Sequence, residues 1–309
     1  MRRSRGVAAV TALLIVAIAA STATFMLAQQ SAMLNQAALV SSRAQADLYA
    51  RAGLDWARGV VAQDGRNTGT VDSLGEAWAQ PIAGLPVERA MVSGNLGDEQ
   101  GKFNLNNLVG ANKQASANDV KILRALFRSL DVPEDLVGAI VDWIDADSDL
   151  SGNGGAEDAY YLGLARPYRT ANQAMVQVDE LHRIRGFDPK VVARVKPFVT
   201  ALPARTAVNV NTASAEVIAA IAPEVPVDAI RAFIDARTSR PFKTTAEMAE
   251  RWKKVPAGAL GSDLDVRTSY FSARVLVSLD DVQLASEALI ERKGNPPGVT
   301  AIIWRRPLY

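Results

Sequence analysis

The apolar positions of this chain form one continuous block, followed by shorter and periodic groups. Residues 7 to 28 are a run of 22 residues without a charge, close to the roughly 20 that a helix needs to cross a bilayer core. Past Ala28 no proline or glycine occurs before Gly53, and apolar residues recur every three or four positions: Met33, Ala37, Val40, Ala44, Leu48 and Ala52. The pattern predicts one long helix over 7–58 whose second half packs along this stripe.

The charges at the N-terminus indicate an orientation. Three arginines precede the apolar run, and no charge follows until Arg43, so the positive-inside rule places residues 29–309 on the far side of a membrane. Three interpretations compete: a secretory signal cleaved near Ala28, a plain anchor, or a prepilin-type leader that is removed after a glycine while the helix stays. The six-residue basic leader ending in Gly6 favours the third. Cleavage after Gly6 and a mature start at Val7 are therefore expected.

Further strands are predicted at both ends of the remaining chain. Glycine and proline punctuate residues 59–108, where extended runs at 86–93 and 102–105 predict a hairpin joined by the turn-rich segment 94–101. Apolar runs at 270–278, 282–291 and 299–304 predict three more strands. Because neither end has enough strands for a stable sheet, both should contribute to one. The sequence predicts an α+β fold with a discontinuous β core (59–108 and 266–309) and an inserted helical domain (109–265).

Composition excludes several kinds of chemistry. The chain has 309 residues, no cysteine, one histidine and a formal net charge of +1. Disulfides, thiolate zinc sites and cysteine nucleophiles are therefore excluded, and a serine–histidine relay would depend on His182 alone. A near-zero net charge gives no electrostatic indication of a nucleic-acid partner.

Part of the predicted helical domain suggests a rival function. Residues 209–221 and 230–237 resemble the helix-hairpin-helix or SAM-like modules of DNA-uptake and repair proteins, whose glycine-rich turn lets backbone amides reach a phosphate. Here the turn is Ala222-Pro223-Glu224-Val225-Pro226-Val227. Two prolines remove amide donors and the glutamate repels phosphate, so the resemblance indicates a shared fold and no nucleic-acid partner is expected.

The densest candidate chemistry lies between residues 142 and 158. Asp145, Asp147 and Asp149 match the first three ligand positions of an EF-hand, but Leu150 replaces the required glycine and Glu157 falls one place late. A calcium-ordered loop and a solvated acidic turn both fit this spacing. Paired carboxylates for hydrolysis are a third interpretation, although no substrate pocket is apparent. The segment contains six carboxylates: Asp142, Asp145, Asp147, Asp149, Glu157 and Asp158.

The whole chain resembles one family, the type II secretion system protein K, a large minor pseudopilin. The motifs that carry the resemblance are the leader through Gly6 and residues 142–145, 155–161, 167–172 and 179–181. The resemblance implies a pseudopilin fold, a long N-terminal helix on a small antiparallel sheet, with a large all-helical insertion. It also implies calcium in the inserted domain. The expected ligands are Asp145, Asp147, Asp149, Glu157 and Asp158, while Asp142 is expected to cap or brace the preceding helix.

The resemblance also implies a role. It implies a structural protein and no enzyme, held by a single inner-membrane helix with its bulk in the periplasm, in a filament that exports folded proteins across the outer membrane. A prepilin peptidase would cleave after Gly6, and Val7 would be methylated. Most pilin-like subunits have glutamate at the fifth mature position, where this chain has Thr11. This departure suits the filament tip, with secretion proteins I and J, and H as a further candidate, as partners. The inserted domain would face the secretin or the exoprotein.

Overall fold

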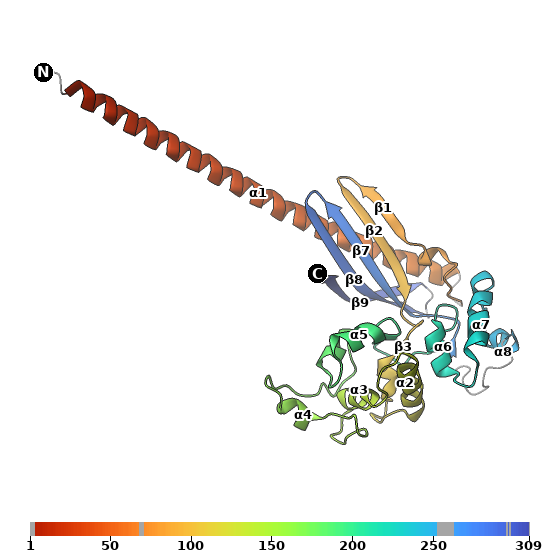
Figure 1. The fold of residues 1–309 in the computed structure, drawn as a ribbon. Helices are drawn as coiled ribbons and strands as arrows, with labels where there is room; N and C mark the ends of the chain where they lie inside the picture. The colour runs from red at the N-terminus through yellow and green to blue at the C-terminus, as the bar shows by residue number, and fades with distance from the viewer. Residues whose placement is uncertain (1–3, 68–70, 252–262, 295, 297, 309) are drawn as a thin grey trace.

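A computed structural model describes residues 4–308 apart from 68–70, 252–262, 295 and 297. Its first element is α1 (Ser4–Asn67), one helix of 64 residues whose N-terminal part projects away from the rest of the chain (Figure 1). Within the described residues α1 alone is long and apolar enough to cross a membrane. The helix continues past the predicted end at residue 58, and both Gly59 and Gly65 lie within it.

The second half of α1 lies along an antiparallel sheet of five strands. The order is β1 (Ile82–Val87), β2 (Ala90–Asp98), β7 (Tyr270–Leu279), β8 (Val282–Lys293) and β9 (Val299–Leu308). The three strands predicted at the C-terminus are confirmed. β7 pairs with β2, β8 with β7 and β9 with β8, so both ends of the chain contribute to one sheet.

The predicted bounds of the first hairpin were wrong. The hairpin forms between β1 and β2, with Val87 opposite Ala90 and a positive φ of 51° at Glu88 in the tight turn. The glycines that suggested a turn after residue 93 lie inside β2. A Cβ on Gly94 would stand 2.9 Å from the carbonyl oxygen of Arg274 on β7, so glycine permits close strand contact here. Residues Phe103–Asn104 form β3, which pairs in parallel with β4 (Val199–Thr200) outside the sheet.

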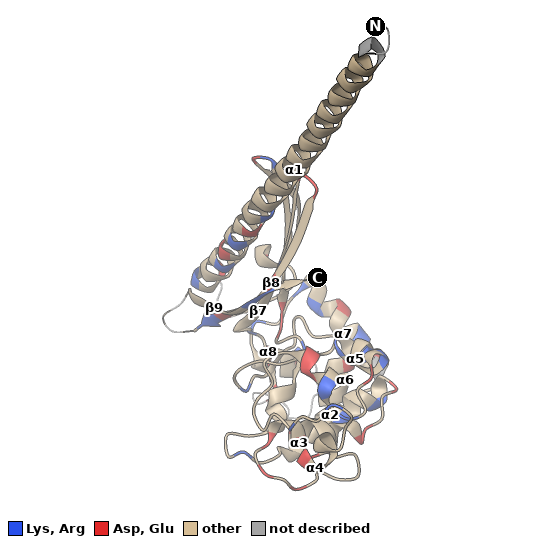
Figure 2. Ribbon diagram, turned by 90° about the vertical axis from the view of Figure 1, so that its left-hand side faces the viewer, with Lys and Arg blue, Asp and Glu red and all other residues tan. Residues whose placement is uncertain are grey.

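The face of α1 that packs on the sheet differs from the predicted stripe. The buried residues are Ala46, Ala50, Leu54, Ala57 and Val61, also spaced by three and four. Their small alanines let the helix backbone approach the strands closely. The predicted stripe instead faces outward, with Met33, Val40 and Leu48 each more than 60% exposed. Figure 2 shows that, past the first turn of α1, its charges begin only on the sheet-proximal half.

A body of mostly short helices lies between β2 and β7 in the sequence and beside one end of the sheet in space (Figure 1). It has its own core, which includes Leu123, Phe127 and Ile140, and two parallel strand pairs, β3–β4 and β5–β6. The remaining elements are η1 (Ala77–Ala79) near α1 and, in this body, η2 (Leu105–Leu108), α2 (Ala117–Ser129), α3 (Leu136–Ile144), α4 (Asp158–Leu162), η3 (Val178–Arg183), α5 (Pro189–Val195), β5 (Val208–Asn209), α6 (Ala215–Ile221), α7 (Val227–Ser239), α8 (Thr245–Arg251) and β6 (Leu264–Asp265).

Buried polar contacts join this body to the sheet. Asp98 ends β2, opposite Phe271 of β7. Its carboxylate accepts hydrogen bonds from Asn209 Nδ2 at 2.8 Å and Thr212 Oγ1 at 2.6 Å. A second link runs through Arg306 of β9, which binds Asp179 of η3 at 2.9 Å and Glu287 of β8 at 2.8 Å. Asp98 and Arg306 belong to the sheet, and Asn209, Thr212 and Asp179 belong to the body, so these contacts fix the body against the sheet.

Candidate metal centre

Two short helices position the acidic loop. α3 is almost entirely buried and ends at Ile144, so its last turns hold Asp142 inside the body and Asp145 at its C-terminal cap. The chain then returns through an exposed loop, and Glu157 stands at the N-terminal cap of α4. Residues from both ends of the loop therefore converge on one place.

Three of the predicted ligands come together there. One carboxylate oxygen from each of Asp145, Asp147 and Glu157 lies within 4.8 Å of the others. Asp145 and Glu157 are 4% and 6% exposed, whereas Asp147 is exposed. Asp145 Oδ1 and Glu157 Oε1 are buried atoms without a hydrogen-bond partner in the described structure. Buried charged oxygens normally have a partner, so this pair calls for a bound cation or a proton.

Asp142 lies beside this three-residue cluster, close enough for its charge to raise the pKa of Glu157 and Asp145, and the sequence did not indicate this position. Its side chain is fully buried, and Oδ1 accepts a hydrogen bond from the amide of Ser151 at 2.9 Å. Its other oxygen, Oδ2, has no partner among the described residues. A Cβ on Gly155 would stand 2.4 Å from that oxygen, so glycine is needed for the loop to close over Asp142.

The electrostatics of the cluster favour a cation. Burial, followed by the charges of Asp142 and Asp145, raises the pKa of Glu157 from 4.5 to about 7. Burial, together with Asp147 and Asp142, raises the pKa of Asp145 from 3.8 to about 6. A positive ion would relieve both effects. Carboxylate oxygens are hard ligands of the kind that calcium prefers, and the sequence has no cysteine to favour a softer metal.

The other predicted ligands have different surroundings. Asp149 is exposed, and its amide donates a hydrogen bond to Asp147 Oδ1 at 2.9 Å. The Asp158 carboxylate accepts two hydrogen bonds of 3.0 Å from Thr170, and it faces Arg169 at 3.3 Å. Asp158 therefore ties α4 to the following segment. Neither carboxylate is part of the three-residue cluster.

The predicted processing residues lie at the start of α1. The helix begins at Ser4, so both Gly6 and Val7 are within its first turns, and Val7 is 65% exposed. The Thr11 hydroxyl lies within reach of the carbonyl oxygens of Val7 at 3.1 Å and Ala8 at 3.0 Å. It can therefore satisfy its hydrogen bond inside its own helix.

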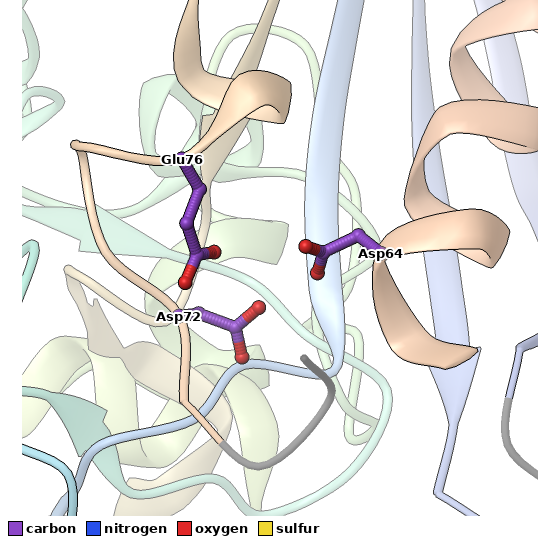
Figure 3. Close-up of side chains that lie close together, drawn as sticks. All are labelled: Asp64, Asp72 and Glu76. Carbon is purple, nitrogen blue, oxygen red and sulfur yellow. The ribbon is translucent and has the colours of Figure 1, made fainter. Parts of the chain in front are cut away.

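A second carboxylate cluster lies where α1 meets the sheet, and no sequence spacing indicated it. Asp64, Asp72 and Glu76 each offer an oxygen within 4.8 Å of the others (Figure 3). Here a cation is already present, because the buried guanidinium of Arg292 binds both Asp64 and Asp72. The cluster therefore differs from the loop cluster, where Asp145 Oδ1 and Glu157 Oε1 have no partner among the described residues.

A long N-terminal helix lying on a small antiparallel sheet defines the pilin-like class of proteins, here with a helical body inserted between two neighbouring strands. In its fold the chain is similar to GspK in the crystal structure of the GspK–GspI–GspJ complex from enterotoxigenic Escherichia coli. The TM-score is 0.77 at 24% identity, over 87% of this chain and 98% of the other.

Sequence comparison identifies the family. Two models of type II secretion system protein K match residues 101–204 and 208–273. The type II secretion system proteins K of Aeromonas hydrophila and Pseudomonas aeruginosa are each 33% identical to this chain over 94% of its length, and over 94% and 90% of their own. The chain belongs to the type II secretion system protein K family, whose members are minor pseudopilins of protein transport. The relatives favour this role over the nucleic-acid-binding alternative.

Proposed function

We propose that this chain caps the tip of the type II secretion pseudopilus, where it has a structural role and no enzymatic one in the export of folded proteins across the outer membrane. The observation that carries the proposal is the outward stripe of α1. Met33, Val40 and Leu48 are each more than 60% exposed, and they continue the apolar surface of the membrane segment. A long apolar stripe of this kind is stable in water only when another helix covers it.

The expected topology follows from the N-terminus. The arginines stay in the cytoplasm, α1 crosses the inner membrane once, and the sheet and helical body lie in the periplasm. A prepilin peptidase removes residues 1–6 after Gly6, and the new N-terminus at Val7 is methylated. The helix then leaves the bilayer when the subunit is packed into the filament.

The position at the tip is supported by Thr11. A glutamate at this place would be costly in hydrocarbon unless the N-terminus of another subunit neutralised it. The Thr11 hydroxyl reaches the carbonyls of its own helix, so it needs no such neighbour. The inserted body also supports this position, because it would obstruct a subunit stacked above it. At the tip it faces the secretin or the exoprotein.

The partners proposed for the stripe are the N-terminal helices of secretion proteins I and J, with H as a further candidate. The similar chain GspK was crystallised in a complex with GspI and GspJ. Calcium is proposed as the ion of the loop cluster, held by Asp145, Asp147 and Glu157, with the negative charge of buried Asp142 beside them. It would fix the loop between α3 and α4 within the body that faces outward.

The stripe can be tested by one substitution. Leu48→Glu places a charge on the 63% exposed position at the centre of the stripe, so it should abolish co-purification of proteins I and J and stop secretion. The fold should be unaffected because the site is exposed. The matched control is Leu74→Glu, at a 57% exposed leucine outside α1, which should retain both partners. Co-purification of I and J with Leu48→Glu at wild-type levels would contradict the proposed interface.

A further inference from the structure

The three carboxylates of the cluster at the end of α1 differ in their partners. Asp72 is fully buried, and both of its oxygens lie 2.6 Å from Arg292 Nη2. It also accepts a hydrogen bond from the amide of Thr268 at 2.7 Å. Asp64, from the last turns of α1, binds the other end of the same guanidinium. Arg292 therefore already binds two carboxylates, and its Nη2 also donates to the carbonyl oxygen of Thr268 at 2.8 Å.

Glu76 is the third carboxylate, and its contacts differ. Within the described structure its side chain forms no salt bridge. Its Oε2 accepts a hydrogen bond from the indole nitrogen of Trp78 at 2.6 Å, while its carboxyl group faces Asp64 and Asp72 (Figure 3). When Asp64 and Asp72 are ionised, their carboxylates can accept hydrogen bonds but cannot donate them. A protonated carboxyl can donate to one of them, whereas an ionised one can only repel them.

The charge state of this cluster changes near neutral pH. Burial, followed by the charges of Asp64 and Asp72, raises the pKa of Glu76 from 4.5 to about 7. Burial also raises the pKa of Asp72, to about 6, against the opposing effect of Arg292. Because Asp72 keeps Arg292 and Thr268 as partners, the shared proton belongs on Glu76, which forms no ion pair with any described residue.

Trp78 connects this carboxyl group to a surface. Its side chain is 2% exposed and packs edge-to-face on Phe271 of β7, with ring centroids 5.2 Å apart. With Ile82 and Val92 it lines an apolar groove of about 390 Å³ between α1 and the β1–β2 hairpin. The segment from Asp72 to Trp78 therefore joins the carboxylate cluster to one wall of this groove.

We propose that Glu76 is a proton-dependent clasp for the segment that holds Trp78 against the sheet. In the protonated state Glu76 donates to the Asp64–Asp72 pair and Trp78 closes the end of the groove. When Glu76 ionises, a third negative charge faces Asp64 and Asp72, which already share Arg292. Glu76 then turns away and the η1 turn with Trp78 loosens. The shape of the groove beside α1 thus follows the proton concentration around the protein.

The test is a pH titration of the full-length chain in detergent micelles. The chain has five tryptophans, so the Trp78 signal is obtained as the fluorescence difference between wild type and Trp78→Phe. Because Glu157 also titrates in this range, all proteins carry Glu157→Gln, and each is compared with its own Trp78→Phe partner in the same buffer. The expected result is a Trp78 transition with a midpoint at about pH 7 that Glu76→Gln removes, leaving the low-pH signal throughout.

A second variant keeps the test decisive if Glu76→Gln folds poorly. Asp64→Asn removes one of the charges that raise the pKa of Glu76, so the midpoint should move to lower pH. A Trp78 signal that is flat between pH 5.5 and 8.5 in the wild-type clasp would overturn the proposal. So would a transition that survives in Glu76→Gln, or a midpoint that Asp64→Asn leaves in place.

Discussion

Calcium should stabilise the inserted body at neutral pH and have little effect in acid. Without a cation, the native state keeps protons on Glu157 and Asp145 up to a pH of about 7 and about 6, whereas the unfolded chain releases them near 4.5 and 3.8. The native state therefore binds more protons between these limits, and its stability falls as pH rises through them. Calcium binds only the ionised carboxylates, so its stabilising effect grows over the same range.

The size of the effect can be worked from the two pKa differences. At about 1.4 kcal/mol per pKa unit, the two differences correspond to about 6 kcal/mol of native-state stability that is lost when both carboxyl groups ionise without a cation. The loop lies close to solvent, and water screens the repulsion, so about half of this, roughly 3 kcal/mol, is expected. A domain of 150–250 residues loses roughly 2–4 °C in melting temperature per kcal/mol. Calcium should therefore raise the melting temperature by roughly 6–12 °C at pH 7.5.

The assay is circular dichroism melting of calcium-stripped, dialysed protein, with and without added calcium chloride, at pH 5.0 and 7.5. The control is the double variant Asp147→Ala with Glu157→Ala, which should melt at one temperature whether or not calcium is added. Equal melting of the wild-type protein with and without calcium at pH 7.5 would refute the reasoning. A response of the same size at pH 5.0 would also contradict it, because the carboxylates are then protonated.

Two further predictions concern glycines. Gly6→Leu should leave an unprocessed precursor and stop secretion. Sequencing the N-terminus of the membrane-bound protein measures the cleavage. A start at Val7 in the variant would contradict the prediction that a leader is cleaved after Gly6. Gly155→Ala should lower both stability, by about 1–3 kcal/mol, and calcium affinity, because its Cβ would meet Asp142 Oδ2. Calcium affinity is measured by calorimetric titration, and the control is Gly59→Ala, at a helical position with open space around it. Equal calcium affinity of the two variants would contradict the proposed packing of Gly155 on Asp142.

The C-terminal sheet could be predicted because its strands alternate regularly. Val275, Val277 and Leu279 are buried every second residue, so the period is visible in the sequence alone. The first hairpin could not be predicted in the same way. Gly94 and Gly97 read as turn residues, but they are strand residues that β7 approaches closely. Only the neighbouring strand, contributed from the far end of the chain, explains them.

Only the part of the candidate site that depends on local sequence spacing could be predicted. Local spacing placed Asp145, Asp147 and Glu157 on one loop, and the structure brings these three together. The inward position of Asp142 depends on how α3 is buried, which spacing does not reveal. The Asp64, Asp72 and Glu76 cluster is further from prediction, because Arg292 joins it from β8. The outward stripe of α1 was likewise visible as a pattern, but its side could not be assigned without the sheet.

The place where the helical body is inserted has a consequence for the order of folding. β2 and β7 are neighbours in the sheet, with Asp98 opposite Phe271, yet the whole body lies between them in the chain. During synthesis β2 is complete long before its partner exists, so its edge stays open while more than 150 residues are added. Pairings so distant in sequence form late. We expect the helical body to fold first on its own core, which brings residues 98 and 271 together and shortens the loop that the sheet must close.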